Sequence, residues 1–287
     1  MSSLAVTTLG AGGARPSGAD LSADLARSRS ESDAGVLVLL PSLGTAAAAL
    51  WKPVAELLPA AVTVLAVDLP GHGSSPPVAP RAGTVLTIEE MAEAVLTTVR
   101  AVLPEEARAL TVAGDSVGGA IALRLALDHP ETVERAAVFC SGAKIGEAQA
   151  WEERAALVER EGTATQVAGS RQRWFAPGFA DRRPAAEAEL IRTLLEADRF
   201  SYAAVCRGLA AFDVRERLQH VRVPLLAVAG AEDSPTPPAG LRALADGVPR
   251  GRYCEVPRTA HLVPAEAPET TAELLMEFMR EGRPGRV

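Results

Sequence analysis

Short continuous runs of apolar residues recur along the chain and predict strands that are buried on both faces. Runs of this kind, ended by glycine or proline, are typical of the inner strands of a parallel sheet. Such runs lie at Val36–Leu40, Thr63–Val67 and 110–113, and further strands are predicted at Val133–Phe139, 224–229 and 252–256. Together they predict the centre of one sheet.

Between several of these runs, apolar residues return at the spacing of a helix. In the segment 87–103 they fall on one helical face, at Ile88, Met91, Ala92, Val95, Val99 and Val102. Further helices are expected at 48–58 and from the glycine-rich segment 114–119 to about Asp128. Strands that alternate with helices imply the α/β class, with a mostly parallel sheet, helices on both faces and a ligand site at the carboxyl ends of the strands.

The alternation is interrupted once. Between Ala143 and Phe212 the pattern is helical only, at 151–161, 166–175, 185–197 and 200–211. An all-helical insertion between two buried strands predicts a cap over the active edge of the sheet. We therefore divide the chain into a core at 19–142 and 213–287 and a helical cap at 143–212.

The amino-terminal part has a weaker pattern. Residues 19–26 alternate between polar and apolar side chains, which predicts a half-buried strand near the edge of the sheet. Residues 1–18 give no prediction of an element. This segment has no basic region followed by a long apolar stretch, so we do not interpret it as a signal peptide.

Composition narrows the functional class. With 29 basic and 36 acidic residues the formal net charge is -7, which argues against a nucleic-acid surface. No apolar run is long enough to cross a membrane, and the expected location is the cytoplasm. The three cysteines, Cys140, Cys206 and Cys254, lack the spacing of metal ligands, and no HExxH pattern occurs, so neither a metal nor another cofactor is expected.

The segment Gly114-Asp-Ser116-Val-Gly118 lies just after a predicted buried strand and just before a helix. In that context the pattern GxSxG is typical of a nucleophile elbow, the sharp turn that exposes the reactive serine of α/β-hydrolases. Glycines two residues either side of the serine let the neighbouring backbone approach it without a clash. We therefore predict Ser116 as the nucleophile.

A serine hydroxyl needs a base to take its proton, and the chain has four histidines. His72 lies in a loop that is expected to shape the site, His129 precedes a proline at a helix end, and His220 lies in a polar approach to a strand. His261 lies in a loop after the last predicted strand and before the final helix. A long loop there can bring its side chain to the elbow, so we predict His261 as the general base.

The carboxylate that orients the histidine precedes it in the chain order of this fold, Ser, then Asp or Glu, then His. Asp233 follows the predicted strand 224–229 and therefore belongs to the carboxyl edge of the sheet. Its neighbour Glu232 is the alternative. Asp233 is the predicted third member of the triad.

Hydrolysis also needs donors for the oxyanion that develops on the substrate, usually two backbone N–H groups. Val117, directly after the nucleophile, is one candidate. Leu43, in the loop Pro41-Ser42-Leu43-Gly44 after the first buried strand, is the other. The alternative interpretation of this loop is an ordinary glycine turn.

With these segments side by side, the chain resembles the 3-oxoadipate enol-lactone hydrolases, the lactonases of the β-ketoadipate route of aromatic catabolism, from about Ala19 to Phe278. The likeness includes the elbow and the segments that begin at Ser42, Asp68, Ala143, Arg173, Gly230 and His261. It implies the α/β-hydrolase fold, cofactor-free lactone hydrolysis and a triad at Ser116, Asp233 and His261. Asp115 departs from the family pattern, which usually has an apolar residue there.

The resemblance implies an anionic substrate, because the lactone of this route carries a carboxylate. Arg154 and Arg173 of the predicted cap are the candidates to bind it, and Trp151 and Trp174 are the candidate pocket walls. The structural alternatives are solvated surface arginines and tryptophans that pack inside the cap.

Two other functions use the same residues. A carboxylesterase or a carbon–carbon bond hydrolase would share the triad, and a cofactor-free haloperoxidase-like side activity would share it too. A non-catalytic, ligand-binding member of the fold is the alternative of another class.

Overall fold

The computed structural model describes residues 3–10, 15–16, 35–104 and 109–281, and its centre is one mixed sheet. The strands are β1 (Val6–Leu9), β2 (Arg15–Pro16), β3 (Val36–Leu40), β4 (Thr63–Val67), β5 (Leu110–Asp115), β6 (Val133–Phe139), β7 (Leu225–Gly230) and β8 (Gly251–Val256). Their order is β2-β1-β4-β3-β5-β6-β7-β8. The strands β4, β3, β5, β6, β7 and β8 pair in parallel, whereas β1 is antiparallel to both of its neighbours.

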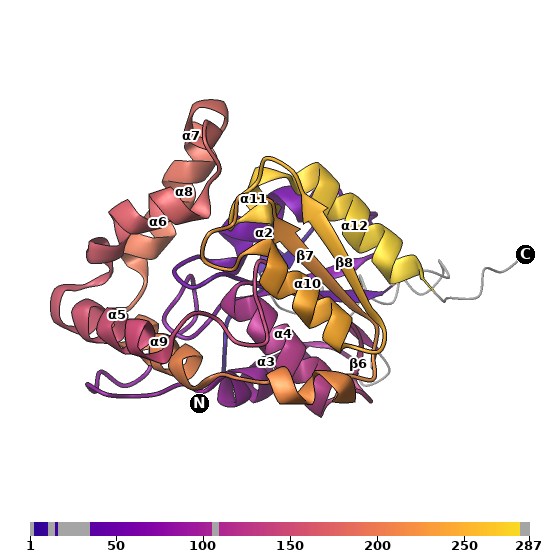
Figure 1. Cartoon of the computed structure of the whole chain (residues 1–287), viewed down its shortest axis with the longest axis horizontal. Helices are drawn as coiled ribbons and strands as arrows, with labels where there is room; N and C mark the ends of the chain where they lie inside the picture. Colours follow the sequence, from indigo (N-terminus) through magenta and orange to yellow (C-terminus); the bar gives the residue numbers. More distant parts are fainter. Residues whose placement is uncertain (1–2, 11–14, 17–34, 105–108, 282–287) are drawn as a thin grey trace, which may run out of the picture.

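Helices cover both faces of the sheet (Figure 1). One face carries α2 (Ala47–Ala55), α11 (Val263–Glu266) and α12 (Pro268–Arg280), and the other carries α3 (Ile88–Val102), α4 (Val117–Asp128) and α10 (Pro238–Gly247). The central strand β3 is continuously apolar because both of its faces are covered, and every one of its residues is buried. The predicted α/β-hydrolase architecture is thus confirmed.

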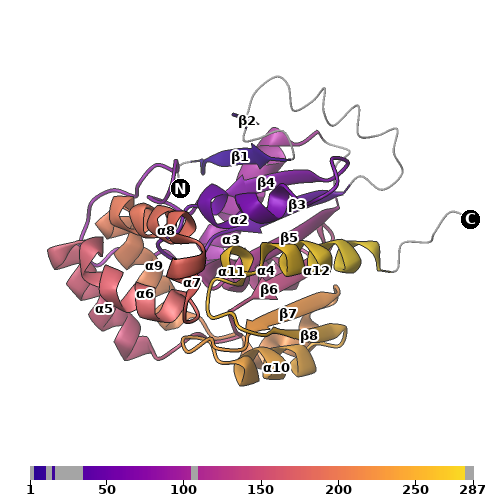
Figure 2. The ribbon, with the colours of Figure 1, turned by 90° about the horizontal axis from the view of Figure 1, so that it is seen from above.

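Between β6 and β7 the chain is helical, with α5 (Ala148–Glu161), η1 (Thr163–Gln166), α6 (Val167–Trp174), α7 (Phe179–Arg182), α8 (Pro184–Glu196) and α9 (Arg199–Ala211). We call residues 148–211 the insertion. Figure 2 shows α5, α6, α8 and α9 gathered at one end of the sheet. An isolated antiparallel bridge between Lys144 and Asp213 joins the two chain segments where the insertion leaves and re-enters the core.

The edge of the sheet differs from the prediction. The strand predicted at 19–26 lies outside the described residues. The first eighteen residues, for which no element was predicted, hold β1 and β2. The sequence Val-Thr-Thr-Leu of β1 has a single fully buried residue, Leu9, so it lacks the continuous apolar run that marks the inner strands.

The other helices and strands for which bounds were predicted begin and end within a few residues of those positions, whereas α7, α10, α11 and the 3-10 helix η2 (Arg215–His220) were not predicted. A capping box explains why α3 begins at Ile88: the Thr87 hydroxyl accepts from the Glu90 N–H at 3.1 Å, and the Glu90 carboxylate accepts from the Thr87 N–H at 3.0 Å. No described helix is both long and apolar enough to cross a membrane.

Candidate active site

The turn between β5 and α4 holds Ser116 in a conformation that L-residues rarely adopt. Its φ is 55° and its ψ is -115°. Such backbone strain costs about 1–3 kcal/mol and persists only where the surroundings enforce it. Here the Ser116 N–H donates to the Phe139 carbonyl at 2.9 Å, and the Ser141 hydroxyl donates to the Ser116 carbonyl at 2.7 Å.

The glycines of the GxSxG segment are required by close backbone contacts. A Cβ on Gly114 would lie 2.1 Å from the Gly118 carbonyl oxygen, and one on Gly118 would lie 2.7 Å from the Leu40 carbonyl oxygen. Atoms at these separations overlap, so neither position accepts a side chain unless the backbone moves. The strand, the strained serine and the helix therefore form the sharp turn that the sequence predicted.

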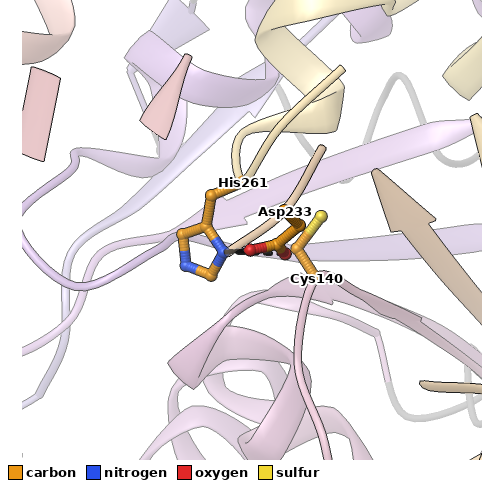
Figure 3. A group of neighbouring side chains, drawn as sticks. All are labelled: Cys140, Asp233 and His261. Atoms are coloured by element: carbon orange, nitrogen blue, oxygen red, sulfur yellow. Dashed lines mark hydrogen bonds and ion pairs between the residues drawn. The ribbon is translucent and has the colours of Figure 1, made fainter. Parts of the chain in front are cut away.

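Asp233 and His261 come from the loops after β7 and β8 and meet at the carboxyl edge of the sheet. His261 Nδ1 lies 3.0 Å from Asp233 Oδ2 and 3.1 Å from Oδ1, as the dashed lines in Figure 3 show. The other ring nitrogen of His261 points away from Asp233 in the same view. A carboxylate in this position holds one tautomer of the imidazole and leaves the other nitrogen free to exchange a proton.

The surroundings keep Asp233 ionised. Burial by itself raises the pKa of Asp233, but the paired His261 and the donors of Thr236 outweigh it, so the pKa is lower than the usual value. The Thr236 hydroxyl donates to Oδ2 at 2.5 Å, and the Thr236 N–H donates to Oδ1 at 3.0 Å. Sequence reasoning missed Thr236, which lies only three residues after Asp233.

Glu232, the alternative carboxylate, takes no part in this pair. Its side chain is exposed, and its N–H donates to the Thr259 carbonyl at 2.9 Å. Adjacent residues in this loop therefore point in different directions, and the structure brings only Asp233 to His261.

Ser116 and His261 line one cavity of about 160 Å³. All four residues predicted for substrate binding line it as well, and so do Ser42 and Leu43 of the loop after β3. No acceptor among the described residues takes the N–H of Leu43 or Val117, the two predicted oxyanion donors. Leu43 lines the cavity directly, whereas the Val117 side chain is fully buried beneath it.

Arg154 and Arg173 of the insertion both line the cavity, and neither has an ion-pair partner among the described residues. The Arg154 guanidinium stacks over the Trp151 ring at 4.6 Å, and the Trp151 indole N–H donates to the Ile145 carbonyl at 2.5 Å. Burial, followed by repulsion from Arg154, lowers the pKa of Arg173. Within the described residues neither arginine has a carboxylate within ion-pair distance. Two unneutralised guanidinium groups beside each other favour an anionic ligand.

Trp174 is both a cavity wall and a packing residue. It is buried, contacts Phe175 edge to face at 6.2 Å, and its carbonyl accepts the Leu262 N–H at 3.1 Å. Tyr202 of α9 also lines the cavity and was not predicted. Its ring stacks on His72 at 6.1 Å, which places His72 behind the cavity wall, and burial lowers the pKa of His72 to about 4.

Asp115, next to the nucleophile, is fully buried, and neither carboxylate oxygen has a hydrogen bond of normal geometry to a described residue. Burial and the charge of Asp233 raise the pKa of Asp115 well above its usual value, and the nearby Ser42 side chain offsets only part of this rise. Burial beside Asp233 therefore favours the protonated, uncharged form of Asp115 over the carboxylate.

Cys140 lies beside the hydrogen-bonded pair of Asp233 and His261 (Figure 3). Its thiol and the side chains of that pair offer possible metal-ligand atoms within 4.8 Å of one another. The thiol donates to the Ala260 carbonyl at 3.5 Å, and burial raises its pKa well above the usual value. A metal ion here would have to displace the proton of the Cys140 thiol and disrupt the hydrogen bond between His261 and Asp233. The donor set therefore fits a hydrogen-bonded base better than a metal centre.

The comparisons with known proteins agree with this geometry. Residues 37–274 match the model of the alpha/beta hydrolase family. A 3-oxoadipate enol-lactonase 2 of Acinetobacter baylyi is 32% identical over 240 residues, which cover 83% of this chain and 86% of that protein. A pimeloyl-(acyl-carrier protein) methyl ester esterase of Aromatoleum aromaticum is 31% identical over 245 residues, or 80% of this chain and 92% of its own.

Among solved structures, the enol-lactonase of Burkholderia xenovorans LB400 superimposes with a TM-score of 0.79 at 28% sequence identity, covering 87% of this chain and 93% of that one. The resemblance to the 3-oxoadipate enol-lactone hydrolases is thereby confirmed. The chain belongs to the alpha/beta hydrolase family.

Proposed function

We propose that this hydrolase opens a small carboxylated lactone, 3-oxoadipate enol-lactone, to 3-oxoadipate through an acyl-enzyme on Ser116. One observation carries the proposal: Ser116 and His261 share a cavity with two arginines, Arg154 and Arg173, that have no carboxylate partner among the described residues. The enol-lactonase relatives support the choice of substrate.

In the first step His261 takes the proton of the Ser116 hydroxyl, and the oxygen attacks the lactone carbonyl. The N–H groups of Leu43 and Val117 stabilise the oxyanion of the tetrahedral intermediate. Asp233 holds the imidazole in the required tautomer and stabilises the imidazolium that forms. Collapse of the intermediate breaks the ring C–O bond and expels an enolate that stays tethered to the acyl chain.

In the second step the enolate takes up the proton held by the His261 imidazolium and becomes a ketone, which removes it as a nucleophile and returns His261 to its neutral form. A water molecule, deprotonated by His261, then attacks the acyl carbonyl. The bond to Ser116 breaks, the serine oxygen recovers its proton from His261, and the keto acid is released. No cofactor is needed in either step.

Substrate recognition falls to the insertion. Arg154 and Arg173 bind the carboxylate of the lactone, and Trp151 and Trp174 form apolar walls for its ring. Guanidinium groups bind carboxylates through paired, charge-assisted hydrogen bonds, and partial burial strengthens these bonds. The raised pKa of Asp115 favours its uncharged form, which does not oppose an anionic substrate. Glu147 also lines the cavity, and its carboxylate pairs with Lys144 at 3.0 Å.

A carboxylesterase with the same residues is the second candidate, because a methyl ester esterase is also a relative of this chain. The experiment that separates the candidates is a panel of enol-lactone and aryl esters, assayed with the wild type and Ser116→Ala. We expect lactone turnover that falls about 10⁵–10⁶-fold in Ser116→Ala, because the nucleophile is lost. Ser234→Ala, which alters an exposed serine next to Asp233, is the control and should stay within a few-fold.

Each other outcome has a clear meaning. Aryl-ester turnover without lactone turnover would make the chain an esterase. Absence of turnover, together with no labelling of Ser116 by a fluorophosphonate, would leave a ligand-binding member of the family.

A further inference from the structure

Glu266 joins the loop of His261 to the insertion through a single carboxylate. Its Oε1 accepts the N–H of Ala260, the residue before His261, at 2.7 Å. Its Oε2 accepts the N–H of Ala176, which follows α6 in the insertion, also at 2.7 Å. We call these two hydrogen bonds the Glu266 bridge. Both are short and have an anionic acceptor, which makes them strong for their type.

Further contacts hold the same stretch of loop. The Leu262 N–H donates to the Trp174 carbonyl at 3.1 Å, and the Cys140 thiol donates to the Ala260 carbonyl at 3.5 Å. A Cβ on Gly230 would lie 1.9 Å from the Ala260 carbonyl oxygen, so the backbone at Ala260 also packs closely against the end of β7. The residues on both sides of His261 are therefore fixed, and the Glu266 bridge is the part of this arrangement that carries a titratable group.

The insertion side of the bridge leads directly into the cavity. Arg173 and Trp174, which line it, lie three and two residues before Ala176, respectively. We propose that Glu266 is a positioning residue: its ionised carboxylate holds the wall at Arg173 and Trp174 in place against the His261 loop, and its protonation loosens the site. The proposal rests on the role of His261 in the function proposed above.

Glu266 titrates in the range where such a change matters. Burial raises the pKa of Glu266 to about 7, although the N–H groups of Ala176 and Ala260 lower it in part. Among charged neighbours, Glu232 raises this pKa and Arg182 of α7 lowers it, while the buried Asp115 faces Glu266 from β5. The helix α2 also packs on α11, but its Lys52 and Glu56 pair with each other at the surface, 3.8 Å apart.

The direction of the effect follows from the donors and acceptors. Above pH 7 the carboxylate has two free oxygens, and each accepts one N–H. Below pH 7 one oxygen carries a proton, which makes it a donor facing an N–H donor, so one of the two hydrogen bonds is weakened. The bridge is complete on the alkaline side and loosens as the pH falls through 7.

The rate at which a fluorophosphonate labels Ser116 tests the proposal without any choice of substrate. It should be measured for the wild type and Glu266→Gln between pH 5.5 and 8.5. Any pH dependence that the two proteins share cancels in the ratio of the two rates. We expect the wild type to be roughly tenfold faster at pH 8.5, the usual effect of one charged hydrogen bond, and the ratio to approach one at pH 5.5. The KM for the lactone should rise in Glu266→Gln at pH 8.5.

Glu269→Gln is the matched control. Glu269 lies three residues further on and also contacts the insertion, at 3.5 Å from Arg183, but both side chains are exposed. Its labelling rate should equal that of the wild type at every pH. A wild-type to Glu266→Gln ratio that does not change with pH would overturn the proposal. Failure of the wild type to be labelled at all would instead contradict the proposed function.

Amide resonances of the ¹⁵N-alanine-labelled wild type provide a second measurement, which decides the question even if Glu266→Gln does not fold. The N–H signals of Ala176 and Ala260 should both shift with a midpoint near pH 7, because both donate to the titrating carboxylate. Separate midpoints, or no shift of Ala176 above pH 5.5, would disprove the bridge as a titrating unit.

Discussion

The carboxyl edge of the sheet, where the strands end, and the insertion both contribute residues to the cavity, but different forces fix their side chains. At the sheet edge, Ser116, Asp233 and His261 are almost completely buried, and backbone contacts or several hydrogen bonds hold each one. In the insertion, Arg154 and Arg173 are half-buried, lack a carboxylate partner among the described residues, and repel each other. Contacts within the protein thus fix the side chains at the carboxyl edge of the sheet, whereas the guanidinium groups of Arg154 and Arg173 keep hydrogen-bond donors that no described carboxylate accepts.

This difference predicts that changes at the edge lower kcat and changes in the insertion raise KM. A group that acts mainly in the transition state affects kcat, and a group that binds ground state and transition state equally affects KM. Asp233→Asn and Arg173→Gln test whether the two regions affect different kinetic constants, and Asp115→Asn tests the stability of the carboxyl edge.

The largest effect is expected for Asp233→Asn at the edge. The amide keeps the shape of the side chain, but it carries no charge to stabilise the imidazolium. An NH₂ group that donates to Nδ1 of His261 also favours the tautomer with its proton on the other ring nitrogen, so kcat should fall by about 10³–10⁴-fold. Steady-state kinetics on the enol-lactone will measure this fall. Glu232 is the adjacent, exposed residue, so kcat of the control Glu232→Gln should stay within a few-fold of the wild type. An equal loss of kcat in both variants would mean that the hydrogen bond from His261 to Asp233 does not orient the base.

A smaller effect, on KM rather than on kcat, is expected for Arg173→Gln in the insertion. Loss of a charge-assisted contact to the substrate carboxylate should raise KM by about 10–100-fold and change kcat little. Arg171→Gln is the matched control, because Arg171 lies on the same helix, is exposed, and pairs with Glu187 at 3.0 Å. Equal KM values for the two variants would remove Arg173 from substrate binding.

The smallest effect on catalysis is expected for Asp115→Asn, which instead alters stability at the edge. Because the folded-state pKa of Asp115 is raised, the native state holds a proton that the unfolded state releases above about pH 4, and this lowers stability as the pH rises. The variant lacks this penalty. Its free energy of unfolding relative to the wild type should increase by up to about 1.4 kcal/mol per pH unit above that point.

Chemical unfolding of both proteins at several pH values between 5 and 8 will show this slope. Contributions from Glu266 and the other titrating groups are shared and cancel in the difference. A difference that stays constant over this range would show that Asp115 does not retain a proton in the folded protein.

The sequence by itself determined the inner sheet and the elbow. Apolar runs located β3, β4, β5 and β7, because strands that are buried on both faces mostly exclude polar side chains. Gly114 and Gly118 located the elbow, because no other residue fits their backbone contacts. Position after a strand then led to His261 and Asp233, since the carboxyl ends of parallel strands meet at one edge.

Only the tertiary structure decided the rest. The edge strand β1 depends on pairing with β4 rather than on its own pattern of burial. That Arg154 and Arg173 lack carboxylate partners among the described residues, that the pKa of Asp115 is raised and that Glu266 bridges Ala260 to Ala176 all follow from contacts between segments far apart in the chain. Local patterns specify the path of the main chain, but the pKa and the partner of a side chain depend on which distant residues pack around it.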